Sequence, residues 1–501
     1  MTPSPPTGRG RRLALLAALL GWMFDGMEMG LFPLVGKDAL GELLKVSSVT
    51  PGAKAEIDLW FGIVMACFLI GAATGGVVFG WLGDKIGRVR AMTASVLLYS
   101  LCSGISAAAG SATELAILRF FGALGMGGEW ALGVALVMEV WPNASRAWLA
   151  GWIGAFGNLG YTVCGLIALG LAKINAGELQ GWLIEAGLPT NLADSLTANR
   201  NWRLLMLLGA VPALLTLFIR LFVPESEKWT REKEAGKASH WSGVDLLAVL
   251  GGAIAAGGVV ALWATKDIPF AAQVGGSILG LVAVTFGYLY PARCYLRRCG
   301  LVAAARREAL GRMLLAAGLS GVPLLATWAA VMWMYQFVTT LPGGGAADAK
   351  PISQIWSSLG AAAGCIVAAA LGGRLGRRVA YAGLCVTSLV TVVGFYQLNT
   401  HYDRAFLVSA GLMGFFTAGF YGWLPLYLPE LFRTAVRATG QGFGFNFGRI
   451  IAAAGNLQMP ALLAFFGGDY GKACTVIAGV YIVGLVLIAV APETKGQPLP
   501  E

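Results

Sequence analysis

Ionisable side chains stand inside apolar stretches of this chain, where they are candidates for proton chemistry. Asp25 and Glu28 are three residues apart, so a helix places both on one face, close enough to interact. A charge at the centre of a bilayer costs roughly 2.5–3.5 kcal/mol on insertion scales, so it should be paired or face water. Like-charge proximity and partial burial favour the protonated acid, which makes both residues candidates for proton exchange near neutral pH. The alternative is that Asp25 only hydrogen-bonds a neighbouring helix.

A second pair of charges flanks a glycine-rich run. Arg119 and Glu129 are ten residues apart, about 15 Å along a helix, so they cannot pair with each other. Glu129 is a further candidate for proton coupling. Arg119 is a candidate for substrate binding if it faces a cavity, and otherwise fastens the end of its helix.

Arg449 is the most informative cation, because it lies midway along an apolar segment rich in glycine. An intramembrane guanidinium has five donors and suits a carboxylate bidentately. We therefore expect Arg449, with Asn446 beside it, to bind an anionic substrate. The alternative is that Arg449 pairs with Asp25 or Glu28 as a structural or gating ion pair.

Amide and aromatic side chains in other apolar segments complete the candidate substrate site. Amides are the stronger candidates, because lipid cannot satisfy their hydrogen bonds. Aromatic side chains taken singly are as often packed or lipid-facing. The candidates are Asn158, Tyr161, Tyr335, Gln336 and Trp423.

The elements that position these residues are membrane-spanning helices. The chain has 501 residues, of which 57% are hydrophobic and only 12% charged, whereas a soluble chain is about 25% charged. Apolar windows of about 18 residues or more predict spanning helices. We find fourteen of them, centred in Leu13–Val35, Leu59–Trp81, Met92–Ala109, Leu115–Met138, Trp148–Leu171, Trp202–Phe222, Val244–Ala264, Phe270–Tyr290, Met313–Val338, Ile355–Leu371, Val379–Leu398, Phe406–Leu428, Gly442–Phe466 and Ala473–Ala491.

The distribution of positive charge predicts the orientation. With a cytoplasmic N-terminus, 24 of the 36 Lys and Arg residues fall on the cytoplasmic side and ten on the opposite side. This bias is the positive-inside rule, so we expect a multi-pass protein of the cell (inner or plasma) membrane with both termini in the cytoplasm. The net charge of +10 then reports topology, and a nucleic-acid partner is not expected.

An internal repeat divides the chain. "GDKIGRVRA" (83–91) matches "GGRLGRRVA" (372–380), and "EVWPNASRA" (139–147) matches "ELFRTAVRA" (430–438) in the same order. The repeat predicts a six-helix half over 1–230 and another over 312–501. Two extra spanning helices are expected within a central linker, 231–311, and two leave the orientation of the second half unchanged. The alternative is a pair of buried or interfacial helices.

This duplicated pattern, with a G-x-x-D-[KR]-x-G-[RK]-like turn after the second helix of each half, resembles the major facilitator superfamily. Within it, "FDGMEMGL" (24–31), "GALGMGGEWALGVALVMEVWP" (122–142) and the fourteen windows look like the sialate:proton symporters. That family includes bacterial sialic acid carriers and fungal lactate and pyruvate carriers. "PESEKW" and "PETKGQPLP" are similar to segments of sugar porters.

The resemblance implies an all-α membrane protein with the major facilitator fold and a latch of charged residues at the cytoplasmic side. Gly373 stands where the first repeat has Asp84, so the two copies of this latch are unequal. Carried onto this sequence, the latch comprises Gly83, Asp84, Gly87, Arg88, Glu139, Arg146, Glu225, Arg377, Glu430, Arg437 and Glu493.

The residues and the resemblance together predict a secondary transporter that imports an organic anion with protons by alternating access. A sialic-acid-like sugar acid, a monocarboxylate, an aromatic acid and a neutral sugar remain alternatives as substrates, and a non-transporting sensor is an alternative role. An enzyme is not expected, because no nucleophile–base set or phosphate-binding loop is present. Eight scattered cysteines and two histidines offer no metal spacing, so no metal or other cofactor is expected. The expected partners are substrate, protons and the bilayer, with a monomeric chain.

Overall fold

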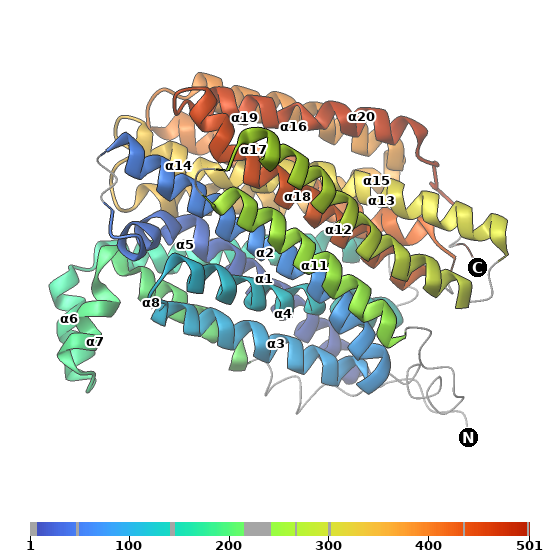
Figure 1. The fold of residues 1–501 in the computed structure, drawn as a ribbon, viewed down its shortest axis with the longest axis horizontal. Coiled ribbons are helices and arrows are strands. Elements are labelled where there is room, and N and C mark those ends of the chain that lie inside the picture. The colour runs from blue at the N-terminus through green and yellow to red at the C-terminus, as the bar shows by residue number, and fades with distance from the viewer. Residues whose placement is uncertain are drawn as a thin grey trace.

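The computed structural model describes residues 8–46, 50–140, 146–214, 242–265, 268–298, 302–433, 436–497 and 500, and these residues form helices and connections without strands (Figure 1). The first helices are α1 (Gly8–Leu43), α2 (Pro51–Ile86), α3 (Arg88–Ile105), α4 (Ala112–Val140), α5 (Arg146–Lys173), α6 (Ala176–Glu185), α7 (Thr190–Thr197) and α8 (Trp202–Leu207). The later helices are α11 (Gly243–Ala264), α12 (Phe270–Arg298), α13 (Ala303–Ala329), α14 (Met334–Phe337), α15 (Ala349–Leu375), α16 (Arg377–Leu398), α17 (Arg404–Tyr427), α18 (Arg437–Phe465), α19 (Tyr470–Ala478) and α20 (Val480–Val490).

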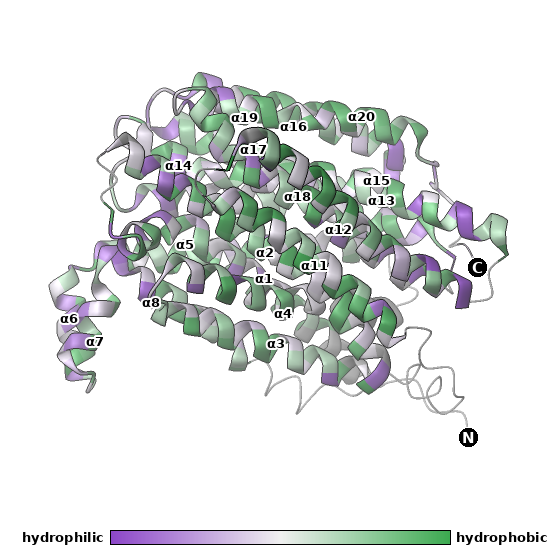
Figure 2. Cartoon of the chain, in the orientation of Figure 1, coloured by the Kyte–Doolittle hydropathy of each residue, from purple (hydrophilic) through white to green (hydrophobic). Residues whose placement is uncertain are grey.

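Every apolar window predicted from the sequence contains helix in the described part of the chain. Eleven of the helical segments searched are long and apolar enough to cross a membrane. The window at 202–222 runs past residue 214, where the described part stops, so the count of fourteen stays a prediction. Figure 2 shows apolar residues along the lengths of the helices, with hydrophilic residues more frequent toward the two ends of the bundle.

The two copies of the sequence repeat share one backbone turn. Gly87 has φ 112° and ψ 154° between α2 and α3, and Gly376 has φ 107° and ψ 159° between α15 and α16. Residues with a side chain rarely adopt such a positive φ, so the turn requires glycine at these two positions. The turn thus explains the final glycine of the repeated motif, while the segment boundaries at 230 and 311 stay a prediction.

A close helix contact occurs at equivalent positions within each half. A Cβ atom added at Gly75 of α2 would lie 1.8 Å from the carbonyl oxygen of Leu124 in α4. One added at Gly364 of α15 would lie 1.9 Å from that of Phe415 in α17. Small residues let membrane helices approach closely in this way, because packing rather than the hydrophobic effect holds helices together in lipid.

The inserted helices α11 and α12 form a hairpin at the side of the bundle, over α2 and α18 (Figure 1). Arg298 and Asp245 form an ion pair between the two helices. The hydroxyls of Tyr288 and Thr74 are 3.0 Å apart, which links α12 to α2. The hairpin therefore contacts α2 of the first half, and α13 and α18 of the second half.

Two short helices, α6 and α7, stand apart at one end of the bundle, at the left of Figure 1. The apolar windows leave this segment, between 171 and 202, without a predicted element. We call this end of the bundle the α6–α7 end.

Candidate functional site

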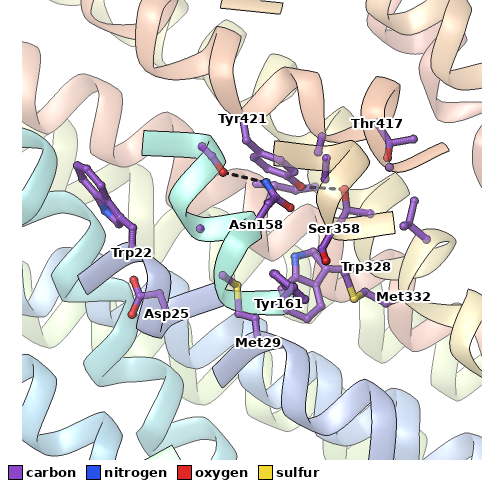
Figure 3. Close-up of a pocket in the computed structure, with 18 of the residues that line it drawn as sticks. Trp22, Asp25, Met29, Asn158, Tyr161, Trp328, Met332, Ser358, Thr417 and Tyr421 are labelled. Atoms are coloured by element: carbon purple, nitrogen blue, oxygen red, sulfur yellow. Dashed lines mark hydrogen bonds between the residues drawn. The ribbon is translucent and has the colours of Figure 1, made fainter. Parts of the chain in front are cut away.

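A central cavity of about 140 Å³ lies between the two halves of the fold. Helices α1, α2, α4 and α5 line it from one half, and α13, α14, α15, α17 and α18 line it from the other. Figure 3 shows Trp22, Asp25 and Met29 of α1 on one wall and Tyr421 and Thr417 of α17 on another. In an alternating-access carrier the substrate site lies at the seam, that is, the boundary between the two halves. Rocking of the halves then changes which side of the membrane this site faces.

Arg449 and Asp25 both line the central cavity and attract each other electrostatically from opposite halves. Nη1 of Arg449 donates to the carbonyl oxygen of Ala72 at 3.1 Å and to Oδ1 of Asn446 at 3.2 Å. The guanidinium carbon lies 4.9 Å from the centroid of the Phe445 ring. Both of these hydrogen bonds use Nη1, so the guanidinium keeps further donors for a carboxylate.

Glu28 and Arg119 lie outside the cavity lining, in a sealed pair. Arg119 donates to one carboxylate oxygen of Glu28, and the hydroxyl of Ser103 donates to the other. Glu28 is 1% and Arg119 2% exposed. The guanidinium carbon of Arg119 lies 4.6 Å from the ring centroid of Phe68. Glu28, a candidate for proton exchange, therefore does not line the central cavity, because its hydrogen-bond partners come from α3 and α4.

Three of the amide and aromatic candidates line the central cavity, namely Asn158, Tyr161 and Tyr335. Asn158 donates from Nδ2 to the carbonyl oxygen of Gly154 at 2.9 Å within α5 (Figure 3). Asn446 lies behind Arg449 and accepts its hydrogen bond. A Cβ atom at Gly76 would lie 2.1 Å from Nδ2 of Asn446, so α2 and α18 touch at this point.

Two other candidates lie elsewhere. Gln336 donates from Nε2 to the carbonyl oxygen of Pro33 at 3.1 Å, which joins the two halves away from the cavity lining. Trp423 donates from Nε1 to the carbonyl oxygen of Arg377 at 3.0 Å and packs against Tyr381 and Tyr427. Trp423 is therefore a packing residue of the second half. Its indole is fully buried, and the hydrogen bond of its N–H offsets the cost of burying that polar group.

The cavity also has lining residues that the sequence analysis missed. Trp328, Met332, Ser358 and Thr417 line it, and Figure 3 labels all four. The hydroxyl of Ser358 lies 2.8 Å from that of Thr162 in the opposite half. A hydroxyl residue within an apolar helix is the sequence signal that could have predicted Ser358 and Thr417. The signal is weak, because most such hydroxyls hydrogen-bond the backbone of their own helix.

Polar contacts between the halves gather at the α6–α7 end. Nζ of Lys350 donates to the carbonyl oxygen of Leu34 at 3.2 Å and to Oδ2 of Asp38 at 3.3 Å. Nζ of Lys37 donates to the hydroxyl of Tyr470 at 2.8 Å and also pairs with Asp58. These contacts hold the halves together at this end of the bundle.

The second copy of the predicted latch forms one cluster. Arg377 donates from Nε and Nη2 to the two carboxylate oxygens of Glu430, at 2.9 and 2.6 Å. The backbone N–H groups of Arg377 and Arg378 donate to Glu493, both at 3.0 Å. Partial burial alone would raise the pKa of Glu493, but these backbone donors outweigh it and lower the pKa below its usual value.

Arg437, the remaining member of that copy, donates from Nε to the carbonyl oxygens of Pro429 and Phe432, at 3.1 and 3.3 Å. Glu225 lies outside the described residues, and the side chains of Asp84, Arg88, Glu139 and Arg146 also lie outside the description, as does that of the proton candidate Glu129. Gly83 and Gly87 lie in α2 and at its end.

Two helical halves around a cavity with a cation in its lining are the architecture of the major facilitator fold, which solved structures also show. The crystal structure of a D-xylose-proton symporter matches with a TM-score of 0.63 at 16% identity, over 97% of this chain and 99% of that one. At this identity the match speaks for the fold alone.

Comparison of sequences finds similarity to named transporters. The family model "Sugar (and other) transporter" matches residues 14–242. The niacin transporter of Acinetobacter baylyi is 24% identical, over 99% of this chain and 97% of the other. The sialic acid transporter of Escherichia coli is 23% identical, over 97% and 95%. The resemblance of this sequence to the major facilitator superfamily, sialic acid carriers included, is thereby confirmed.

Proposed function

We propose that this protein is a proton-coupled symporter for a small organic anion. The observation that carries the proposal is the meeting of Arg449 and Asp25 in one cavity, from opposite halves. A guanidinium with donors to spare is a site for a carboxylate, and a neighbouring acid is a site for a proton. Both sites adjoin the seam that opens and closes during alternating access.

The size and lining of the cavity favour a ring-sized monocarboxylate. At about 140 Å³ it resembles the cavity of about 150 Å³ in another protein that binds benzene. Tyr161, Trp328 and Tyr335 offer aromatic surface, and Asn158 offers an amide. The similarity to a niacin transporter agrees with this class, and the similarity to a sialic acid transporter agrees with an acid.

Proton coupling follows from exchange of partners at Arg449. A substrate carboxylate that binds Arg449 competes with Asp25 for the cation, and a buried carboxylate that loses its cation takes up a proton more readily. Substrate and proton then travel together, because a buried carboxylate that loses the attraction of a nearby cation is less stable in its charged form. Glu28 and Glu129 remain further proton candidates, Glu28 only if its pair with Arg119 opens during the cycle.

We further propose that the α6–α7 end is extracellular, as the positive-inside bias predicts, and that both termini are cytoplasmic. The contacts of Lys350 with Asp38 and of Gln336 with Pro33 then close the external side. In this assignment the structure represents a conformation closed to the outside.

Uptake into proteoliposomes tests the proposal. Labelled niacin, benzoate, lactate, sialic acid and glucose are offered with and without an imposed pH gradient, and empty liposomes serve as the control. We expect a ring-sized carboxylate to accumulate only with the gradient, and glucose not to accumulate. Accumulation of glucose, or carboxylate uptake that ignores the gradient, would refute the proposed substrate class or the coupling, respectively.

A further inference from the structure

A second cavity of about 160 Å³ lies at the α6–α7 end, between the two halves and apart from the central cavity. Its polar lining consists of Asp38 of α1, Arg200 and Asn201 before α8, and Lys350 in the first turn of α15. Its other walls are mainly apolar, from α1, α5, α8 and Pro351. No residue of this cavity lines the central one.

The cavity holds more positive than negative charge. Two cations converge on one acid: Nζ of Lys350 is 3.3 Å from Oδ2 of Asp38, and Nε of Arg200 is 4.0 Å from Oδ1. Lys350 is 5% exposed, although a cation is unfavourable in the first turn of a helix. The positive end of the α15 dipole adds to the two cations, so an anion is favoured here.

The backbone before α8 is held in an unusual conformation that presents Arg200 and Asn201 to this cavity. Asn199, Arg200 and Asn201 have φ angles of 45°, 61° and 59°, which residues other than glycine adopt uncommonly. Glu42 holds the turn from both sides: it accepts hydrogen bonds from Asn199 and Trp202 at 2.7 Å and from Arg203 at 2.8 Å. Such strain persists only where the surroundings over-determine it, and it concentrates at functional sites.

The amide of Asn201 adds an acceptor that the described residues leave unused. Asn201 is 8% exposed and lines the cavity, and its Oδ1 has no hydrogen-bond partner among the described residues. A buried acceptor without a partner is costly, so a ligand with a donor would find one here. A carboxylate for the cations and a hydroxyl for Asn201 together describe a small hydroxycarboxylate.

We propose that this second cavity binds a small hydroxycarboxylate, and that the bound carboxylate replaces Asp38 as the partner of Lys350. The proposal rests on the proposed function for the charge of its ligand. Because Asp38 belongs to one half and Lys350 to the other, exchange of partners breaks a contact that holds the halves together. Binding at the second cavity therefore favours opening of the α6–α7 end.

Equilibrium binding of radiolabelled 3-hydroxybenzoate to the purified full-length protein tests this site. The Arg449→Ala variant disables the central site and should keep one class of binding sites. Adding Arg200→Asn should weaken that class about tenfold, since a charge-assisted hydrogen bond is lost while asparagine still tolerates the positive φ. Adding Asp38→Asn should instead tighten it at least about threefold, because the competing carboxylate is gone. Arg404→Asn, at an exposed arginine that begins α17, is the matched control and should change nothing.

The outcomes separate the two proposals. If Arg449→Ala binds no 3-hydroxybenzoate while the wild type does, or if Asp38→Asn weakens binding in a variant that remains monodisperse, the second cavity is refuted. If Arg449→Ala instead retains both classes of site, the central assignment fails, and the effect of Arg200→Asn still decides the second cavity. Binding of 3-hydroxybenzoate no tighter than benzoate would refute the role of Asn201.

Discussion

Asp25 and Glu28, the two acids of the first helix, make the sharpest comparison within this molecule. Asp25 lines the central cavity between the halves, and Arg449 of the other half lines the same cavity. Glu28, one turn further along α1, faces Arg119 inside one half, with Ser103 completing its hydrogen bonds. The residue types are nearly the same, and the surroundings differ.

The role of a buried charge thus depends on its hydrogen-bond partners and on whether it adjoins a cavity. Both carboxylate oxygens of Glu28 are hydrogen-bonded by its own half, so the pair can move with that half as a unit. Among the described residues, Arg449 donates its hydrogen bonds to Ala72 and Asn446 from Nη1, and the acid that attracts it, Asp25, belongs to the other half. In the proposed mechanism, Arg449 at the seam exchanges partners during transport, whereas the sealed pair of Glu28 and Arg119 stabilises one half.

Replacing Arg449 is expected to have the largest effect. Arg449→Ala removes the cation of the cavity, and truncating one partner of a buried charge pair costs about 2–5 kcal/mol, or roughly 30-fold or more in affinity. Arg449→Lys should recover part of this, because the charge remains but the bidentate geometry does not. Substrate affinity measured by calorimetry checks both, and unchanged affinity in Arg449→Ala would remove Arg449 from the substrate site.

Breaking the sealed pair should affect stability rather than affinity. Arg119→Met leaves Glu28 buried without its cation, which should lower the free energy of unfolding by about 3 kcal/mol. The double variant Glu28→Leu with Arg119→Met should regain most of that loss, since two apolar side chains replace the pair. Thermal unfolding in detergent measures it, with Arg404→Met as the exposed control. A stable Arg119→Met protein with weakened substrate binding would contradict the division of roles.

Substitutions of Asp25 and Glu28 should have different effects on proton-coupled accumulation of substrate. Asp25→Asn should abolish accumulation against a gradient and leave substrate exchange intact, because binding continues without an exchangeable proton. Glu28→Gln should keep accumulation within about threefold of the wild type, as expected of a structural hydrogen-bonded pair. Uptake and exchange in proteoliposomes measure both quantities. The reverse result would transfer the proton site to the sealed pair.

The smallest expected effect lies at Glu493, which follows the candidate span Tyr470–Val490. The pKa of Glu493 is lowered in the folded protein, so its contribution to stability is complete above its ordinary value of 4.5 and is lost as the pH falls below it. Because the side chain is exposed, this contribution is small. Glu493→Gln should therefore flatten the decline of the unfolding temperature between about pH 5 and 3. An unchanged slope would indicate that the backbone hydrogen bonds of Glu493 add no net stability.

Much of the fold could be predicted from sequence, because lipid imposes one rule on the whole chain. Backbone groups must be satisfied within a helix, so each apolar window predicted one. The repeat predicted the twin turns at Gly87 and Gly376, where positive φ demands glycine. The segment between 171 and 202 has no such rule, and α6 and α7 were accordingly not predicted.

The candidate site was predicted only in part. Asp25, Arg449, Asn158, Tyr161 and Tyr335 do line the cavity, because a polar group in an apolar helix seldom faces lipid. The same reasoning could not separate Glu28 from Asp25, or Trp423 from Tyr335, since each pair is equally apolar in context. The pairing of Lys350 with Asp38 was not predicted, because it joins helices whose residues are more than 300 positions apart in sequence.

The sequence by itself determined the membrane class, the helices and the duplicated architecture, because hydropathy and repeats act along the chain. Only the tertiary structure decided which acid meets which arginine, and which of these pairs adjoins a cavity. Pairing energies depend on distances of a few ångströms and on desolvation, and both arise only when helices from distant parts of the chain pack together.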